Sequence, residues 1–318
     1  MKISDIIADA KDPFVSFEII PPARGRSAKQ IYEIIDELIE FSPPFIDVTS
    51  HAADFYFEEH TDGTFTRHIK RKRPGTLGLC AAIKYRYGVE AVPHLLCQGF
   101  TKQETEDALI ELNYLGLDNV LAIRGDQLQF EKTHPAGREA NEHAVDLVKQ
   151  IVDMNRGVYL EDILDADETD FCIGVGAYPE KHPDAPSPAA DVRYLKQKVD
   201  AGADYVVTQM FFDNADYFSF VEACREAGIT VPILPGIKLL TRKKQLSTLP
   251  KAFSVNIPDE LVTAIEEAND LQESREIGVE HSIKQCQELI DAGVKNIHFY
   301  VMQDSRLVKR VVKELKLS

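Results

Sequence analysis

The chain has 318 residues, 44% of them hydrophobic, which is enough to bury the core of one large α/β domain or of two smaller ones. Its 36 basic and 52 acidic residues give a formal net charge of -16, which argues against a nucleic-acid-binding protein because such proteins usually carry a positive surface. No run approaches the ~20 apolar residues of a membrane span, and the first residues lack the apolar stretch of an export signal, so we expect a soluble, cytoplasmic protein.

The cysteines stand singly along the chain, with no CxxC pair and no spacing typical of metal ligands. This pattern predicts neither a disulfide framework nor a zinc site, so we expect no bound metal and a reducing compartment. The five residues are Cys80, Cys97, Cys172, Cys224 and Cys286.

The first predicted strand, Phe14–Ile20, is followed by Pro21 and Pro22, which cannot continue a strand ladder. Strand alternation places Ser16 and Glu18 on one face, opposite the apolar residues. Removing the Glu18 carboxyl from water would raise its pKa, which suits a general acid at neutral pH. A glutamate on an edge strand in water, or one in a salt bridge, explains the residue equally well at this point.

The first half of the chain then alternates helical and strand patterns. Helices are predicted where apolar residues recur at helical spacing, and Thr101 followed by Glu104 predicts a capping box. The basic run Arg67–Arg73 is interpreted as a solvated helix end, with an anion-binding patch as the alternative. The predicted helices are Ser27–Phe41, Thr61–Arg73, Leu79–Tyr87 and Thr101–Leu115, and the predicted strands are Phe45–Thr49, Val89–Cys97 and Asn119–Asp126.

The strand Asn119–Asp126 ends abruptly in Arg124, Gly125 and Asp126. A buried strand that delivers a cation, a flexible residue and an anion to one edge of a sheet can build a site on a rigid element. The same residues alone are also compatible with an ordinary turn. The hypothesis of a site gains weight because several other predicted strands also end in polar residues.

The second half of the chain continues the alternation. Gly174 and Gly176 do not form a dinucleotide-binding fingerprint, because Pro179 stands where the third glycine would be and no helix begins at once. The predicted strands are Phe171–Ala177, Asp204–Met210, Val231–Ile237 and Asn296–Met302. The predicted helices are Glu142–Asn155, Asp191–Ala201, Asn214–Ala227, Leu240–Thr248, Pro258–Asn269, Ile277–Ala292 and Ser305–Leu315.

About eight strand-helix units without a domain-boundary linker predict an α/β fold, a (β/α)8 TIM barrel formed by residues 1–318 as a single domain. An open doubly wound sheet is the alternative. In such barrels the active site lies at the carboxyl ends of the strands. Polar residues at or just past the predicted strand ends support this location: Glu18, Thr49, His94, Asp126, Tyr178 and Gln209.

Seven motifs, in order and spacing over nearly the whole chain, resemble the catalytic domain of methylenetetrahydrofolate reductase. They are FEIIPP (Phe17–Pro22), PHLLC (Pro93–Cys97), LAIRGD (Leu121–Asp126), GAYPEKHPDA (Gly176–Ala185), DAGADYVVTQMFFD (Asp200–Asp213), ILPGI (Ile233–Ile237) and HFY (His298–Tyr300). The resemblance implies a flavoprotein barrel in which NADH or NADPH reduces bound FAD and the flavin reduces 5,10-methylenetetrahydrofolate to 5-methyltetrahydrofolate. It also implies the short bacterial form of this enzyme, and we expect a homo-oligomer.

The resemblance assigns three catalytic residues. Glu18 matches the glutamate of the family's FEFFPP-like motif and would be the general acid for folate ring opening, kept protonated by its apolar neighbours. Asp126 matches the aspartate near the flavin and the pterin, where a carboxylate would stabilise a cationic iminium. Gln209 matches an amide that contacts the folate and the nicotinamide substrate in turn.

The same matching implies a set of FAD-binding residues. Arg124, His182 and Lys198 suit a pyrophosphate, and Gly125 lets the backbone approach the cofactor closely. Thr49 would also lie near the nicotinamide. The full implied set is Thr49, Ser50, Ala52, His94, Arg124, Gly125, Asp126, Ala144, Tyr178, His182, Ala185, Asp191 and Lys198.

Folate contacts are implied for Asp126, Gln209 and Gln245. The family pattern runs toward an arginine after the last strand, but Asp304 stands at the aligned position, so we expect Arg306 to substitute for it.

Two other functions stay open. A barrel aldolase or lyase would need a Schiff-base lysine buried at a strand end, for which Lys84, Lys181 and Lys238 are weak candidates. A non-catalytic flavin- or folate-binding subunit is compatible with the departure at Asp304. Flavin absorbance that bleaches with NADH and recovers with methylenetetrahydrofolate would separate the three hypotheses.

Overall fold

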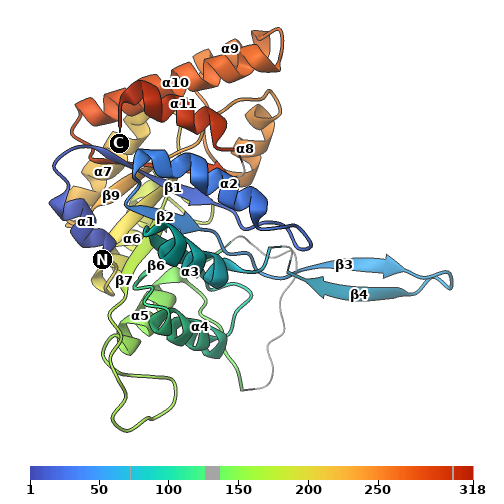
Figure 1. Ribbon diagram of the computed structural model, residues 1–318, viewed down its shortest axis with the longest axis vertical. Helices are drawn as coiled ribbons and strands as arrows, with labels where there is room; N and C mark the ends of the chain where they lie inside the picture. The colour runs from blue at the N-terminus through green and yellow to red at the C-terminus, as the bar shows by residue number, and fades with distance from the viewer. Residues whose placement is uncertain (72, 126–136, 303, 318) are drawn as a thin grey trace.

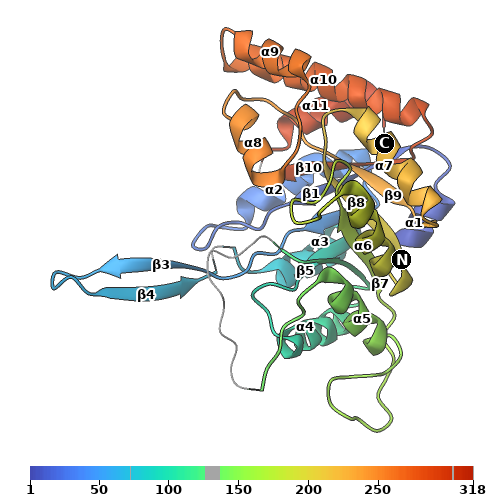
Figure 2. The ribbon, with the colours of Figure 1, turned by 180° about the vertical axis from the view of Figure 1, so that it is seen from behind.

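The chain forms a closed barrel of parallel strands, seen from opposite sides in Figure 1 and Figure 2. The computed structural model describes residues 1–71, 73–125, 137–302 and 304–317. Around the barrel the strand order is β1-β10-β9-β8-β7-β6-β5-β2, and β1 pairs with both β10 and β2 to close the ring. The predicted (β/α)8 barrel is confirmed, and the open sheet is excluded. The strands are β1 Phe14–Ile19, β2 Phe45–Val48, β5 Glu90–Leu96, β6 Asn119–Ile123, β7 Cys172–Ala177, β8 Tyr205–Met210, β9 Ile233–Ile237 and β10 Asn296–Met302.

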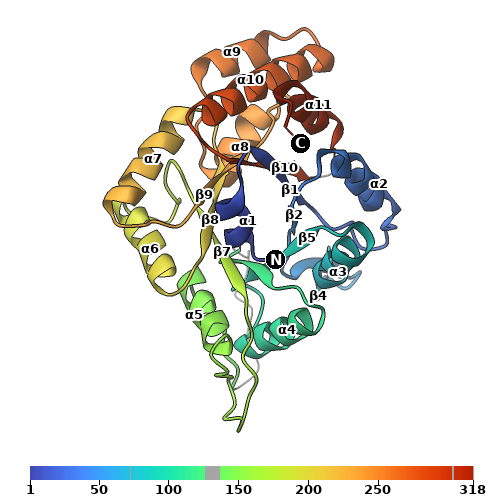
Figure 3. The same cartoon turned by 60° about the vertical axis from the view of Figure 1, so that its left-hand side comes forward.

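Helices follow the strands on the outside of the barrel (Figure 3). The predicted capping box is confirmed, because Thr101 Oγ1 accepts from the Glu104 backbone N–H at 3.1 Å and Glu104 Oε2 accepts from the Thr101 backbone N–H at 2.7 Å. No helix in the described part of the chain is both long and apolar enough to cross a membrane. The helices are α1 Ile3–Asp9, α2 Lys29–Leu38, η1 Ile39–Phe41 (a 3-10 turn), α3 Thr76–Tyr87, α4 Lys102–Tyr114, α5 Ala144–Met154, α6 Pro188–Asp200, α7 Asn214–Glu226, α8 Gln245–Phe253, α9 Asp259–Glu267, α10 Leu271–Asp291 and α11 Arg306–Leu315.

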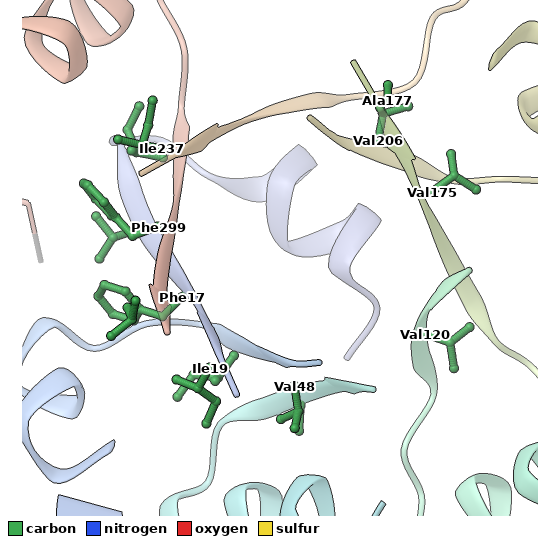
Figure 4. Packing of buried hydrophobic residues seen from close by; sticks show 14 of the residues in the cluster. Phe17, Ile19, Val48, Val120, Val175, Ala177, Val206, Ile237 and Phe299 are labelled. Carbon is green, nitrogen blue, oxygen red and sulfur yellow. The ribbon is translucent and has the colours of Figure 1, made fainter. Parts of the chain in front are cut away.

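Strand alternation sends apolar side chains outward, where they pack under the helices. Figure 4 shows Phe17 and Phe299 among the outward-pointing residues of this core. Both are fully buried, and their ring centroids lie 6.3 Å apart. Burial of each such side chain stabilises the fold by roughly 1.5–3 kcal/mol. Because the outward face is fixed in this way, Ser16 and Glu18 of β1 point into the barrel interior, here called the lumen, as the alternation predicts.

The amino-terminal mouth of the lumen is closed by α1, which lies across the ring of strands in Figure 3. Ile3 is fully buried in a cluster with the first residues of several strands, among them Phe14, Phe45 and Tyr205. Its backbone N–H donates to the side-chain oxygen of Asn119 at 2.9 Å. The sequence patterns did not predict this helix, because its 7 residues are too few for helical periodicity to show.

Two strands outside the barrel, β3 (Asp54–Glu59) and β4 (Phe65–Lys70), form an antiparallel hairpin that projects from the body of the molecule (Figure 1). The helix predicted at Thr61–Arg73 was therefore wrong. Cross-strand contacts such as His68 Nε2 to Glu58 Oε2, at 2.7 Å, hold the hairpin together. These partners are 10 residues apart in the chain, a separation that local helical spacing does not sample.

Gly236 in β9 makes room for the Tyr300 side chain, which reaches over β9 from β10 to β8. A Cβ atom there would lie 2.3 Å from the Thr208 carbonyl oxygen and 2.5 Å from the Tyr300 ring. We therefore expect Gly236→Ala to lower the free energy of unfolding by roughly 1–3 kcal/mol in urea denaturation. Gly78→Ala is the matched control, because a Cβ in this part of α3 meets nothing within 4 Å and alanine favours a helix. Equal losses in the two variants would contradict the packing argument.

Candidate functional site

Polar side chains gather around Glu18 at the carboxyl ends of the strands. In the parallel ladders of β1, the Cα partners of Glu18 are Asp47 on β2 and Tyr300 on β10. His94 joins them from β5, the neighbour of β2. Four adjacent strands thus contribute to one buried polar region, and β1 pairs on both sides, which excludes an edge-strand glutamate.

Glu18, Asp47 and His94 form what we call the acid cluster. His94 Nε2 lies 3.5 Å from Glu18 Oε2 and 3.5 Å from Asp47 Oδ2. The exposed fraction of the side chain is 11% for Glu18, 5% for His94 and 0% for Asp47. With so little water nearby, the charges of the cluster act on one another more strongly than they would at the surface.

Burial is the largest influence on the pKa of Glu18. It raises the pKa of Glu18 to about 7, with Asp47 adding to the rise and His94 and Lys238 opposing it. For His94, burial would lower the pKa, but Asp47 and Glu18 outweigh this effect and raise it. The rise expected for the Glu18 pKa is therefore found. A carboxyl that keeps its proton near neutral pH beside a cationic imidazole is suited to proton donation.

Tyr300 connects the acid cluster to the opposite side of the lumen. Its hydroxyl donates to the carbonyl oxygen of Thr208 in β8, next to Gln209. Lys238, which follows β9, donates to the Tyr300 carbonyl oxygen at 3.0 Å, and burial lowers the pKa of this lysine to about 8. The Gln209 side-chain oxygen accepts from the next backbone N–H at 2.9 Å. Glu18 and Gln209 both lie near the carboxyl ends of their strands, on the same rim.

A second group of predicted residues lies after β6, after β7 and on α6. We call Arg124, His182 and Lys198 the cation cluster. Arg124 Nη1 lies 2.7 Å from Asp184 Oδ2, and Lys198 Nζ donates to the Gly176 carbonyl oxygen. Burial lowers the pKa of Lys198 to about 8, and it lowers that of His182, where the charges of Arg124 and Lys198 act in the same direction. Grouped N–H donors of this kind suit a phosphate or pyrophosphate ligand.

The other predicted FAD-binding residues follow the same rim. Asp191 accepts from the His182 backbone N–H at 2.7 Å, which fixes the loop after β7, and the Tyr178 and His182 rings meet edge to face with centroids 4.6 Å apart. Gly125 has a φ of 88°, a left-handed conformation that favours glycine. Asp126 lies outside the described residues. Thr49, Ser50 and Ala52 follow β2, His94 lies in β5, Ala144 begins α5, and Ala185 is buried in the loop after β7.

The predicted folate-contacting residues on the helices are held in different ways. Gln245 begins α8, and its side-chain oxygen accepts from the Thr241 backbone N–H at 2.8 Å. Arg306 begins α11, has a side chain that is 73% exposed, and donates to Asp304 through two hydrogen bonds of 2.9 and 2.8 Å. The charge of Asp304 opposes the lowering of the Lys238 pKa, which places the Arg306–Asp304 pair on the Lys238 side of the rim.

Asp47, Ser16 and His298 were not among the predicted site residues. Ser16 Oγ lies 2.8 Å from His298 Nδ1 inside the lumen, and burial lowers the pKa of His298. The sequence did contain a signal for Asp47, because it is an acidic residue at an alternate position of an apolar strand, like Glu18. His298 gave no comparable signal, since a histidine in a strand is often packed in the core.

The three lysines considered for Schiff-base chemistry occupy different environments. Lys84 pairs with Glu90 at 2.9 Å, at the start of β5 and therefore at the amino-terminal end of the barrel. Lys181 donates to the Ala185 carbonyl oxygen of its own loop at 2.7 Å. Of the three, Lys238 is the one beside the acid cluster. Among the described residues no group of histidine, cysteine and carboxylate side chains could hold a metal ion, and the five cysteines are free and buried.

Comparison with known proteins gives a consistent result. The family model for methylenetetrahydrofolate reductase matches residues 2–316. The 5,10-methylenetetrahydrofolate reductase of Pectobacterium carotovorum is 31% identical over 92% of this chain and 87% of its own length. The probable methylenetetrahydrofolate reductase (NADH) of Oryza sativa is 31% identical over 99% of this chain and 50% of its own length, so the chain spans about half of that relative.

A solved structure shares the architecture. It is described as an uncharacterized protein from Clostridium thermocellum that binds two copies of 5-methyl-5,6,7,8-tetrahydrofolic acid. The two chains superpose with a TM-score of 0.59 over 99% of each, at 13% sequence identity. At this identity the likeness concerns the fold alone.

Burial of Glu18 should make the stability of the protein depend on pH. Because the pKa is raised from 4.5 to about 7 on folding, the native chain should lose roughly 3 kcal/mol of stability relative to Glu18→Gln as pH rises through that window. Urea unfolding of both proteins at several pH values would measure the difference. Glu111→Gln, an exposed substitution of the same type on α4, is the control against which the Glu18→Gln difference is measured. A stability difference between the native chain and Glu18→Gln that stays constant with pH would contradict the raised pKa of Glu18.

Proposed function

Because this chain belongs to the methylenetetrahydrofolate reductase family, we propose that it reduces 5,10-methylenetetrahydrofolate to 5-methyltetrahydrofolate, with FAD as the bound cofactor and NADH or NADPH as the electron donor. The observation that carries the proposal is the buried carboxyl of Glu18, with a pKa of about 7, at the rim of the lumen. Opening the folate ring needs a proton donor that still holds its proton near neutral pH. Residues 1–318 would act as one catalytic domain.

Glu18 would be the general acid. Its proton goes to the ring nitrogen that departs when the five-membered ring opens, and the electron pair of the broken C–N bond stays on that nitrogen. The product of this step is a cationic iminium that can accept a hydride. By the sequence resemblance, the carboxylate of Asp126 would stabilise this cation.

The residues of the cation cluster fit a flavin dinucleotide. Arg124, His182 and Lys198 offer N–H donors to its pyrophosphate, and the left-handed backbone of Gly125 allows a close approach. Thr49 Oγ1 is buried with no hydrogen-bond partner among the described residues, so it can donate to a ligand. FAD would supply the group that takes a hydride from the nicotinamide and gives it to the folate. The further proposed contacts are Ser50, Ala52, His94, Asp126, Ala144, Tyr178, Ala185 and Asp191.

Gln209, Gln245 and Arg306 are proposed to bind substrate. The amide of Gln209 can donate and accept, which suits a site that holds folate and nicotinamide in turn. Gln245 would bind folate through the amide that now accepts from Thr241. Arg306 would exchange its contact with Asp304 for an anionic part of the folate, since a guanidinium binds carboxylates in the same two-pronged geometry.

A lyase or aldolase reaction is a second candidate, favoured by one observation. Lys238 is partly buried at the end of β9, and burial lowers its pKa to about 8, which suits a Schiff-base lysine. In that case the purified protein would carry no flavin, and borohydride in the presence of a carbonyl substrate would trap a covalent adduct on Lys238.

The reductase proposal is tested by following flavin absorbance without oxygen. We expect the purified protein to carry FAD, NADH or NADPH to bleach it, and methylenetetrahydrofolate to restore the oxidised spectrum. Glu18→Gln should leave the bleaching step intact and slow the recovery step by about 100-fold or more, because only the second step needs the proton. A protein without flavin would rule out the reductase, and equal slowing of both steps would contradict an acid role for Glu18.

Lys198 should contribute to FAD affinity through its charge. We expect Lys198→Met to weaken FAD binding by roughly 10- to 100-fold, since a hydrogen bond to a charged group contributes about 1.5–3 kcal/mol. Lys196→Met is the matched control, because Lys196 lies on the same helix and pairs with Asp200 at the surface. FAD affinity is measured by fluorescence titration of the apoprotein. Similar affinities for the two variants would remove Lys198 from the proposed site.

A further inference from the structure

Two carboxyl groups face one another inside the lumen. Glu18 and Asp47 are Cα partners on neighbouring parallel strands, and their side chains are almost or fully removed from water. Two carboxylates held this way repel, so one of them must keep a proton or both must share a cation. A retained proton on Glu18 relieves the repulsion before the reaction, and a positive group between the two carboxyls would relieve it once that proton has left.

His94 occupies that position but satisfies neither carboxyl well. Its Nε2 is 3.5 Å from both, which is long for a hydrogen bond, and one N–H can point to only one acceptor at a time. Within the described residues, His94 Nε2 and both carboxyl oxygens of Asp47 lack a hydrogen-bond partner. A buried ion pair without good hydrogen bonds is a poor source of stability, so a purely structural role explains the cluster badly.

We propose that Asp47 and His94 are positioning residues that set the acidity of Glu18: Asp47 keeps His94 cationic, and the His94 cation stabilises the charge left on Glu18 after proton donation. This inference rests on the proposed reductase function. The proton of Glu18 passes to the departing folate nitrogen, and the negative charge that remains lies 3.5 Å from the imidazolium. Solvent restores the proton once the product has left, so His94 itself transfers none.

The charges around Glu18 agree with the roles proposed for Asp47 and His94. Among the groups that oppose the rise of the Glu18 pKa, His94 contributes most and Lys238 less, while Asp47 adds to the rise. Lys238 comes from β9 and is engaged with the Tyr300 carbonyl oxygen, and the Tyr300 hydroxyl is directed to β8. Removing the imidazolium would thus leave Glu18 a weaker acid with a higher pKa.

Asp47→Asn and His94→Gln test the proposal when the two half-reactions are measured separately across pH. For His94→Gln, a proposed FAD contact that is therefore assayed with saturating FAD, we expect folate reduction to slow by roughly 10- to 100-fold more than flavin reduction by NADH slows, with the alkaline limb of folate reduction at higher pH. For Asp47→Asn we expect folate reduction to slow near neutral pH and to recover as the pH falls, because burial lowers the pKa of His94 once Asp47 no longer raises it. His60→Gln, in the projecting hairpin, is the control and should alter neither half-reaction.

A second measurement needs no substrate. The difference in stability between the unaltered protein and its Glu18→Gln variant changes with pH, and the midpoint of this change reports the pKa of Glu18. The same comparison is then made with His94→Gln present in both proteins, and the midpoint should move to higher pH. An unmoved midpoint, or a loss of both half-reactions without recovery at low pH, would overturn the positioning role. If the unaltered protein catalyses neither half-reaction, the reductase function is contradicted instead. The pH midpoint of the stability difference would still decide whether His94 acts on Glu18.

Discussion

The removal of the Glu18 carboxyl from water is the constraint on which the rest of the site depends. The closed barrel removes this carboxyl from water, because every strand of the barrel is paired on both sides and alternate residues of β1 must point into the lumen. The apolar core between the strands and the helices then determines which residues of β1 point inward. A glutamate in contact with solvent would hold no proton at neutral pH.

The rim divides into two electrostatic regions that suit two tasks. Strands β10, β1, β2 and β5 carry the acid cluster and Tyr300, groups that hold or respond to a proton. Strands β6 and β7 and helix α6 carry the cation cluster, whose donors suit phosphates. Separating the regions around the ring keeps Arg124 and Lys198 apart from Glu18, whose cationic neighbours are His94 and Lys238, while both regions open on the same mouth. A barrel allows this because neighbouring strands differ in sequence but end at one level.

Most of the architecture could be predicted from the sequence, since helical spacing and strand runs follow from local burial. The exceptions have physical reasons. The hairpin β3–β4 depends on partners across a turn, and α1 is too short to show periodicity. At the site, Glu18 could be predicted because an acidic residue interrupts an apolar strand. Asp47 interrupts its strand in the same way, but its role depends on the strand register that places it beside Glu18, which the sequence does not show. The resemblance supplied the FAD residues, and Asp126 lies outside the described residues.

Helix α1 closes one end of the lumen. Ile3 and the first residues of several strands pack together as an apolar cluster at the amino-terminal mouth. A ligand of Glu18 must therefore enter and leave by the carboxyl-terminal mouth. The two substrates of the proposed reaction would have to take turns at this single entrance.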